Sequence, residues 1–303
     1  MTGEQLLSNL SKVLKGRVKA SEPMSKHTSW RIGGPADYYA EPADSGDLCR
    51  ALAWARENRL PVTVIGNGTN LLVSDSGVRG LVLKPGPGLS GIEIKGAVIN
   101  AGAGTPLPRM AQTALQAGLS GFEFLAGIPG TVGGALLMNA GANGCSVGER
   151  VLRVETVDYE GHAKTFAKSE LEFGYRKSCL SQRDLIITGA AFAGLLRPGE
   201  EIKKKMDDYL NRRRSTQPLE QPNAGSVFKN PPGDSAGRLI ESAGCKEMRV
   251  GAIQVSPRHA NFFVNLGGGT AADVLALVRA VRTAVEEQCG VKLLLEVQML
   301  GEF

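Results

Sequence analysis

The segment from Gly127 to Gly144 has the composition of a loop that holds a large anionic ligand. It contains six glycines, one proline, two asparagines and no charged side chain. Glycine adopts positive φ and lets a backbone approach its neighbour closely, so such a segment can aim several N–H groups at one anion. A surface loop without this task would carry charges, and their absence indicates a segment shaped around a ligand.

A second glycine segment, Gly66 to Asn70, directly follows a predicted strand at 61–65. A glycine turn at a strand end is a common phosphate cradle. It is not a dinucleotide fingerprint of the Rossmann kind, because Leu71 stands where G-x-G-x-x-G requires its third glycine. No glycine run ends in Lys-Ser or Lys-Thr, so a P-loop is absent as well. Two tight turns without a ligand are the alternative for either segment alone, and the pair favours a ligand site.

The apolar and charged fractions of the chain indicate a folded protein, and its net charge favours binding of a small anionic molecule. The 303 residues are enough for two or three domains, and 42% of them are apolar and 21% charged. No apolar run approaches the length of a membrane span, and residues 1–26 contain no signal-peptide core. We therefore expect a cytoplasmic protein without membrane insertion. The formal net charge of +5 favours an anionic partner.

Other classes of site have little support in the sequence. Five scattered cysteines and three histidines lack the spacing of a disulfide framework or a zinc site, so we expect no metal. Basic runs at 203–205 and 212–214 lack the interleaved aromatic residues that stack on bases. We therefore expect no nucleic-acid partner.

The pattern of elements predicts the α+β class. Helices are expected at 44–58, from Thr105-Pro106 to Gly118, at 200–214, at 238–243 and from Thr270 to Gly290. Strands are expected at 61–65, 81–84, 151–159, 162–167, 184–195, 250–255, 261–266 and 291–300. Composition changes near 197–215, which we take as the best-supported domain boundary.

The two glycine segments, in this order and separation, resemble the FAD-binding domain of vanillyl-alcohol-oxidase-type flavoproteins. The resemblance implies that FAD lies between two small α+β subdomains, with the first segment at its pyrophosphate. Gly66 to Asn70 contains no histidine or cysteine, so the flavin is expected to be non-covalent. The implied cofactor-binding residues are Gly66, Asn67, Gly68, Thr69, Asn70, Leu71, Gly127, Ile128, Pro129, Gly130, Thr131, Gly133, Gly134, Asn139 and Gly141.

Further motifs narrow the resemblance. They are Ser29–Ala36, Tyr175-Arg176, Ala224–Pro231, Ala236–Glu241 and Leu295–Val297. Together, over nearly the whole chain, they resemble the family of UDP-N-acetylenolpyruvoylglucosamine reductases, and His259–Asn265 points to its shorter second type, which lacks an extra tyrosine-bearing loop. This implies FAD-binding subdomains at 1–84 and 85–200, a substrate domain at 201–296, and a tail, 297–303, that packs on the first subdomain.

The resemblance implies a reduction in which NADPH, through FAD, supplies a hydride to an enolpyruvyl UDP-sugar. It assigns catalytic roles to Arg176, Ser226 and Glu296. A guanidinium can hold the substrate carboxylate through two hydrogen bonds, and a well-placed hydroxyl can deliver a proton to the α-carbon. From the residues alone, a surface salt bridge is the alternative for Arg176, and the otherwise apolar neighbourhood of Gly174-Tyr175-Arg176 disfavours it. An ordinary turn serine is the preferred reading of Ser226 without the resemblance, and Glu296 is a carboxylate that is either exposed or buried and paired.

Binding of the UDP-sugar requires donors for its diphosphate. The candidates for this diphosphate are Arg214, Lys229 and Asn230, of which Asn230 and Arg214 are favoured. Tyr175 and His259 are further substrate-binding candidates. A lone histidine beside a buried strand is as often a core group with satisfied hydrogen bonds.

Two other functions remain open at this point. A flavin oxidase or dehydrogenase acting on a hydroxy acid would use the same cofactor domain. A non-catalytic module that binds a UDP-sugar or ADP-ribose would use the loops without flavin.

Overall fold

The computed structural model describes residues 2–303, apart from the side chain of Gln182. Internal contacts divide the chain into two compact units. The first comprises the chain up to Ala20, Tyr38–Asn67 and Gly80–Arg212, and the second comprises Ser21–Asp37, Gly68–Arg79 and Arg213–Phe303. The resemblance instead implies three parts, namely two cofactor subdomains at 1–84 and 85–200 and a substrate domain at 201–296. This division stays a prediction.

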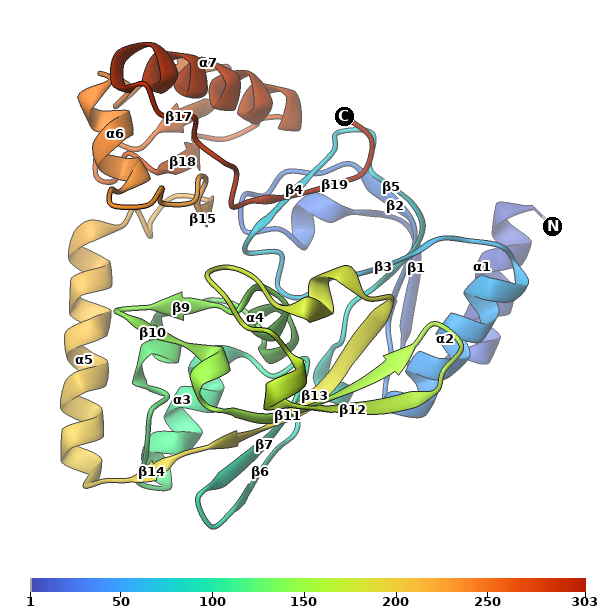
Figure 1. Ribbon diagram of the computed structural model, residues 1–303. Coiled ribbons are helices and arrows are strands. Elements are labelled where there is room, and N and C mark those ends of the chain that lie inside the picture. Colours follow the sequence, from blue (N-terminus) through green and yellow to red (C-terminus); the bar gives the residue numbers. More distant parts are fainter. Residues whose placement is uncertain (1) are drawn as a thin grey trace. The chain divides into compact units, whose positions relative to one another are not determined.

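An antiparallel five-stranded sheet dominates the first unit, in the order β12-β11-β13-β7-β6 (Figure 1). Its strands are β6 (Ile92–Lys95), β7 (Val98–Gly102), β11 (Val151–Asp158), β12 (Ala163–Ala167) and β13 (Leu185–Ala193). Two small pairs accompany it: β8 (Leu119–Ser120) with β14 (Leu195–Leu196), and β9 (Gly141–Ala142) with β10 (Cys145–Ser146). The helices are α1 (Gly3–Val13), α2 (Ser45–Glu57), α3 (Leu107–Gln116) and α4 (Val132–Met138), and α5 (Gly199–Thr216) leads towards the second unit.

A second sheet has the strand order β1-β2-β5-β3. Its strands are β1 (Arg17–Pro23), β2 (Pro35–Glu41), β3 (Val62–Val64) and β5 (Val78–Leu83), and β3 runs parallel to β5. The first glycine segment, Gly66 to Asn70, therefore begins one residue after β3, since the strand ends at Val64 and not at the predicted residue 65.

Cap chemistry explains most helix boundaries in the first unit. Asp44 caps α2 by accepting a hydrogen bond from Asp47 N at 2.7 Å. Helix α3 ends before Gly118, which has φ of 65°. Its N-cap is Pro106 and not the predicted Thr105, because Pro106 itself has extended backbone angles.

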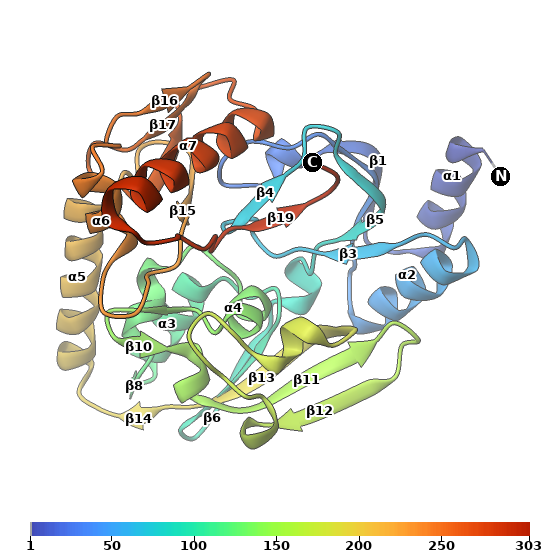
Figure 2. The same ribbon diagram turned by 45° about the horizontal axis from the view of Figure 1, so that its top comes forward.

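The second unit holds a four-stranded sheet in the order β15-β18-β17-β16 and two helices. The strands are β15 (Asn223–Ser226), β16 (Arg249–Val250), β17 (Ile253–Val255) and β18 (Phe262–Asn265), and the helices are α6 (Ala236–Ser242) and α7 (Ala271–Cys289). A parallel pair joins β4 (Leu71–Val73) to β19 (Gln298–Leu300), and Figure 2 shows these two strands side by side. The interior of the unit is built around Trp30, Phe228, Phe263 and Val281, all at most 1% exposed.

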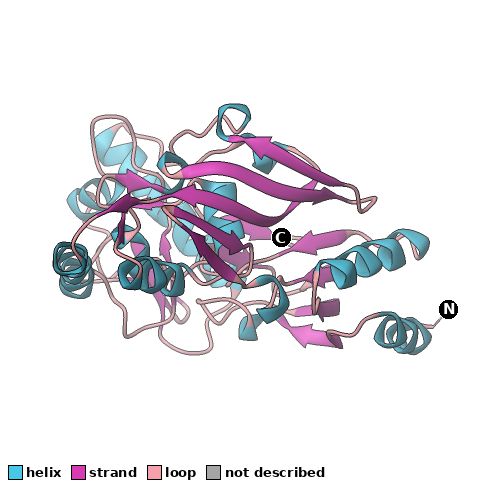
Figure 3. Ribbon diagram, turned by 90° about the horizontal axis from the view of Figure 1, so that it is seen from below, coloured by secondary structure: helices cyan, strands magenta, loops and turns pink. Residues whose placement is uncertain are grey.

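Helix α7 follows its predicted limits. Thr270 and Asp273 form a capping box at its start, and Gly290, with φ of 67°, ends it. The mixture of helices and strands in Figure 3 confirms the predicted α+β class.

The predicted strand at 291–300 is wrong over most of its length, since only β19 is a strand. The reason is a change of partner at Glu296. Upstream of it, Lys229 N bonds Leu294 O, whereas downstream Gln298 N bonds Asn70 O. No single neighbouring strand continues along the whole segment, so the only ladder is the one between β19 and β4 at its end, within residues 2–303.

Membrane-spanning helices and clusters of metal ligands are both absent from the residues that the structure describes. No helix within residues 2–303 is long and apolar enough to cross a membrane. In the same range no group of three or more His, Cys, Asp or Glu side chains is arranged to hold a metal ion.

Candidate active site and cofactor loops

The two glycine loops touch each other in the first unit. Asn67 Nδ2 donates a hydrogen bond to Pro129 O at 3.4 Å. A Cβ placed on Gly66 would lie 2.7 Å from Thr131 Oγ1. A side chain at position 66 would therefore require the Thr131 hydroxyl to move, and glycine accommodates the close approach of the second loop without that shift.

Several backbone donors in these loops are available to a ligand. In the described part of the chain, the N–H groups of Asn67, Gly68 and Thr69 donate no hydrogen bond, and the same holds for Gly130 and Thr131. Successive N–H groups in a turn with one left-handed residue, here Gly68 with φ of 62°, form a concave anion site. Backbone donors of this kind can bind phosphate oxygens, and their role in cofactor binding stays a prediction.

The second loop passes into helix α4 through Thr131. The Thr131 hydroxyl caps this helix by accepting from Gly134 N at 3.5 Å. Gly133 N donates to Ala103 O at 2.8 Å, and a Cβ on Gly133 would lie 3.1 Å from the Ala103 Cβ. Part of the predicted loop is thus helical. Glycine at position 133 allows this helix to pack closely on Ala103, the residue that follows β7.

The end of the same segment is a β-hairpin. Asn143 and Gly144, with φ of 54° and 78°, form the two-residue turn between β9 and β10. Gly141 lies in β9, where a Cβ would come within 2.5 Å of Cys145 O. The glycines at this end therefore serve the turn, and the cofactor role of Gly141 stays a prediction.

Arg176 lies in a tight turn that also carries Tyr175. Gly174 N donates to Lys177 O at 2.9 Å, and Lys177 N donates to Gly174 O at 3.2 Å. Arg176 has φ of 52°, a region that costs a non-glycine residue about 1–3 kcal/mol. Its guanidinium carbon lies 5.3 Å from the centre of the Tyr175 ring, and Tyr175 is 58% exposed. Strain of this kind is typical of residues held for a function.

Ser226 and Glu296 lie on paired segments of the second unit. Glu296 N donates to Val227 O at 2.8 Å, and Phe228 forms a bridge with Leu295. The Glu296 residue is 9% exposed. Within residues 2–303 the half-buried Ser226 hydroxyl makes no hydrogen bond, so it is available to a ligand.

The first glycine segment reaches Glu296 through its last residue. Asn70 Nδ2 donates to Glu296 O at 3.1 Å, and Asn70 O accepts from Gln298 N at 2.9 Å. A residue that the resemblance assigns to the cofactor is thus bonded to the backbone of a predicted catalytic residue.

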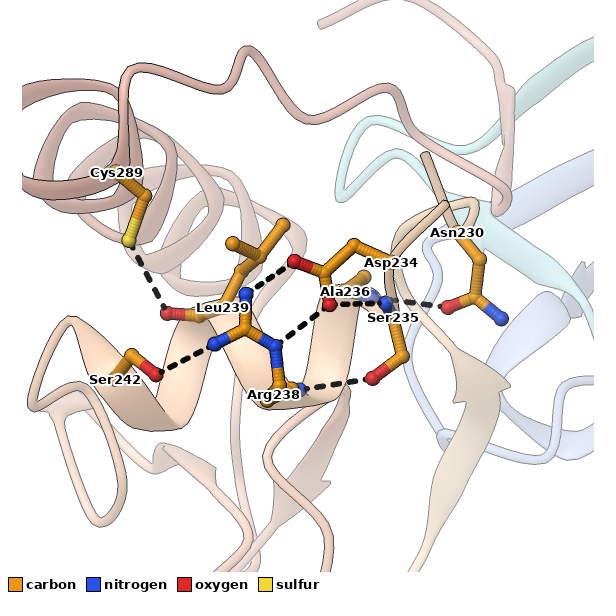
Figure 4. A network of polar contacts seen from close by, with 8 residues as sticks. All are labelled: Asn230, Asp234, Ser235, Ala236, Arg238, Leu239, Ser242 and Cys289. Carbon is orange, nitrogen blue, oxygen red and sulfur yellow. Dashed lines mark hydrogen bonds and ion pairs between the residues drawn. The ribbon is translucent and has the colours of Figure 1, made fainter. Parts of the chain in front are cut away.

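Asn230 lies at the start of a polar network around α6 (Figure 4). Its Oδ1 accepts from Ala236 N at 3.0 Å, so its exposed amide NH₂ is the group that faces outward as a donor. Nearby, Arg238 donates two hydrogen bonds to Asp234, and this guanidinium lowers the pKa of Asp234 to about 2. Arg238 was noted only as part of a motif, and here it stabilises the turn that follows Asn230.

The other predicted substrate residues differ in exposure. Arg214 is exposed near the end of α5, and Lys229 is half-buried. Burial lowers the pKa of His259. Its Nδ1 accepts a hydrogen bond from Asn261 N at 3.3 Å, and the centres of the His259 and Phe262 rings lie 4.7 Å apart. Burial therefore favours the neutral form of His259, and its role in substrate binding stays a prediction.

Asn261 supports the site although its residue type and spacing did not mark it as a candidate. This residue is 2% exposed, and its side chain accepts from Phe228 N at 2.9 Å and donates to Phe228 O at 2.8 Å. It thereby fixes the backbone that follows Ser226. The only signal in the sequence was a polar residue between Ala260 and Phe262, in a stretch that otherwise reads as a strand core.

Comparison with known proteins identifies two families along the chain. Residues 217–300 match the family described as UDP-N-acetylenolpyruvoylglucosamine reductase, C-terminal domain. Residues 36–167 match the family described as FAD binding domain, which confirms the predicted cofactor fold.

Curated relatives match the chain from end to end. It is 47% identical over 298 residues to UDP-N-acetylenolpyruvoylglucosamine reductase of Desulforamulus reducens, with 98% of each chain covered. It is 48% identical over 299 residues to the protein of the same name from Moorella thermoacetica, again with 98% of each covered. The crystal structure of UDP-N-acetylenolpyruvylglucosamine reductase (MurB) from Thermus caldophilus is 40% identical, with a TM-score of 0.83, and the match covers 94% of this chain and 100% of that one.

Proposed function

The chain belongs to the UDP-N-acetylenolpyruvoylglucosamine reductase family, and we propose that it uses NADPH to reduce the enolpyruvyl group of UDP-N-acetylglucosamine enolpyruvate. The product is UDP-N-acetylmuramic acid, which supplies peptidoglycan synthesis. The observation that carries the proposal is the 2.8 Å bond between Glu296 N and Val227 O, because it joins the segments of Ser226 and Glu296.

FAD fits the backbone donors of the two glycine loops. When bound, it supplies hydride transfer from NADPH to the β-carbon of the substrate alkene. The loop glycines and Thr131 hold it, and no histidine or cysteine in Gly66 to Asn70 is present to bond it covalently.

Arg176 binds the substrate carboxylate in this proposal. As hydride reaches the β-carbon, negative charge builds on the α-carbon and the carboxylate. A preorganised guanidinium at that point stabilises the charge by about 3 kcal/mol. The left-handed turn that carries Arg176 supports this role, since its strain is maintained by the surrounding structure.

Ser226 delivers the proton to the α-carbon. Its hydroxyl has no competing partner within the described residues, and Gly225, with φ of 75°, sharply bends the chain before it. A serine hydroxyl is a weak acid and needs a nearby group to support the transfer. We assign that supporting role to Glu296, whose segment is paired with that of Ser226.

The UDP moiety requires hydrogen-bond donors, which we assign to the predicted substrate residues. Asn230 offers its outward amide, while Tyr175, Arg214, Lys229 and His259 complete the proposed set. The cytoplasm is the proposed compartment, in keeping with five cysteines that are all free thiols.

The colour and reoxidation of the purified protein test the proposal. We expect a yellow flavoprotein that NADPH reduces under anaerobic conditions and that the enolpyruvyl UDP-sugar reoxidises. Rapid reoxidation by oxygen with a hydroxy-acid donor would instead favour an oxidase. A protein without a flavin spectrum, even after addition of FAD, would favour a nucleotide-binding module.

A further inference from the structure

A short helix connects the second glycine loop to the turn that carries Arg176. Helix α4 starts after Thr131 in the loop and ends at Asn139, whose left-handed φ of 43° terminates it. Asn139 Nδ2 donates to Gly174 O at 2.8 Å. Gly174 directly precedes Tyr175 and Arg176, so the end of α4 is bonded to the first residue of the turn.

A second hydrogen bond holds the other side of the same turn. The fully buried Ser178 donates through Oγ to Leu137 O, in the last turn of α4, at 2.8 Å. The segment from Gly174 to Ser178 is therefore fastened at both ends to one helix, and that helix begins in the predicted cofactor loop.

Both ends of the Asn139 side-chain amide form hydrogen bonds within the protein. Asn139 is 7% exposed, and its Oδ1 accepts from Gly148 N at 3.0 Å while its Nδ2 bonds Gly174 O. These two partners fix the orientation of the amide, because a carbonyl requires the NH₂ group and an N–H requires the oxygen. Removal of the NH₂ leaves the Gly174 carbonyl without its side-chain donor.

The turn depends on such hydrogen bonds because packing contributes little at its tip. Tyr175 is 58% exposed, and Arg176 is held in a strained left-handed conformation. Bidentate recognition of a carboxylate requires the guanidinium to be correctly placed before the substrate arrives, since small displacements lower the rate strongly.

We propose that Asn139 is a positioning residue for Arg176, acting through the carbonyl of Gly174. Its side chain makes α4 and the Arg176 turn one body, so that the second cofactor loop and the carboxylate-binding arginine keep a constant spacing. The inference rests on the proposed function for the role of Arg176 and differs from the sequence-based assignment of Asn139 to direct cofactor binding.

The matched variant is Asn139→Asp. Aspartate has the same shape, tolerates left-handed φ and still accepts from Gly148 N, but it turns a carboxylate oxygen towards the Gly174 carbonyl. We expect reoxidation of the reduced enzyme by the enolpyruvyl UDP-sugar to slow by about tenfold, as for loss of one buried hydrogen bond. The rate of FAD reduction by NADPH and the dissociation constant of FAD should change by less than about twofold, since the loop donors remain.

Two further variants sharpen the comparison. Ser178→Ala removes the second bond to α4 and should slow the same half-reaction. Asn143→Asp is the control, because Asn143 is also left-handed but lies exposed in the β9–β10 turn. It should leave both half-reactions unchanged.

Hydrogen exchange of the holoprotein supplies a readout that needs no turnover. The hydrogen-bonded amides of Gly174 and Lys177 should exchange about tenfold faster in Asn139→Asp than in the wild type, because the turn opens more easily. They should exchange at the wild-type rate in Asn143→Asp.

The outcomes separate this inference from the proposed function. Unchanged exchange, or faster exchange with normal reoxidation, overturns the positioning role. A loss of FAD affinity that accounts for the whole defect shows direct cofactor binding instead. If the wild type is not reoxidised by the enolpyruvyl UDP-sugar but the exchange of 174–177 still responds, the proposed function fails while the attachment of the turn stands.

Discussion

The side-chain amide of Asn70 is hydrogen-bonded to the backbone carbonyl of Glu296, with 3.1 Å between Nδ2 and O. The two residues are 226 positions apart in the sequence. Gln298 Nε2 also donates to this carbonyl at 3.1 Å, so two amides hold the backbone at Glu296. The last residue of the first glycine segment thus contributes to the placement of a predicted catalytic carboxylate.

Replacement of Asn70 by alanine is expected to affect substrate reduction beyond any loss of cofactor. With FAD at saturation, reoxidation of Asn70→Ala by the enolpyruvyl UDP-sugar should slow about two- to tenfold, the worth of one hydrogen bond. Gln298→Ala removes the other donor and should have a smaller effect, since Asn70 remains. Stopped-flow absorbance of the flavin measures both. A wild-type rate in Asn70→Ala at saturating FAD would show that Asn70 serves the cofactor alone.

Ser226→Ala should separate the two half-reactions. NADPH should still reduce the flavin at close to the wild-type rate, whereas reoxidation by substrate should fall about 100-fold, because a positioned general acid contributes at least that factor. Ser242→Ala, an exposed serine that only accepts from Arg238, is the control. Equal slowing of both half-reactions would exclude Ser226 as the specific proton donor.

Local chemistry explains what the sequence predicted correctly about the fold. Asp44, Thr270 and Gly290 mark helix ends by interactions within a few residues, so these boundaries follow from the residues themselves. The stretch 291–297 is apolar enough for a strand, yet its hydrogen bonds go to two different partners. That change of partner is a tertiary property and leaves no local signal.

The same distinction holds for the site. Glycine density predicts both cofactor loops, because close approach needs glycine whatever the partner is. The amide bonds of Asn70, Asn139 and Asn261 were not predicted. Their partners lie 226, 35 and 33 positions away, and nothing near an asparagine identifies the carbonyl that it will bind.

Gly66→Ala should weaken FAD binding through a clash within the first unit. The added Cβ would lie 2.7 Å from Thr131 Oγ1, and overpacking of this kind costs about 1–3 kcal/mol. Titration of the apoprotein with FAD, followed by flavin fluorescence, should show at least a tenfold weaker complex, or about 1.4 kcal/mol. Gly91→Ala is the matched control, because no atom lies within 4 Å of a Cβ there.

A double-mutant cycle identifies the clash as the cause. Thr131→Ala alone loses the cap of α4, at a cost of about 1 kcal/mol. In the double variant the clash is absent. The loss of FAD-binding free energy in the double variant should therefore be smaller than the sum of the two single losses by about 0.5–3 kcal/mol. Strict additivity would mean that Gly66 acts through the flexibility of its own turn and not through contact with Thr131.

Asp47 should make the stability of the protein depend on acidity. Its carboxylate is fully buried and accepts hydrogen bonds from Lys15 N, Gly16 N and Ala43 N at 2.9–3.0 Å and from Arg50 at 2.7 Å. Burial by itself raises the pKa of this group, but the four donors outweigh it and lower the pKa to about 2, from 3.8. The charged form is therefore favoured in the folded state.

The sign of the pH dependence follows from that depressed pKa. Above pH 3.8 the ionised Asp47 contributes about 2 kcal/mol, and this contribution disappears as the pH falls from 3.8 towards 2, where the folded form also becomes protonated. Asp47→Asn should lower the urea midpoint of the holoprotein at pH 7, and the difference from wild type should shrink at pH 3. Glu93→Gln, which breaks an exposed pair with Lys95, should change little at either pH. A difference for Asp47→Asn that is equally large at both values would show that lost hydrogen-bond geometry, and not charge, accounts for its effect.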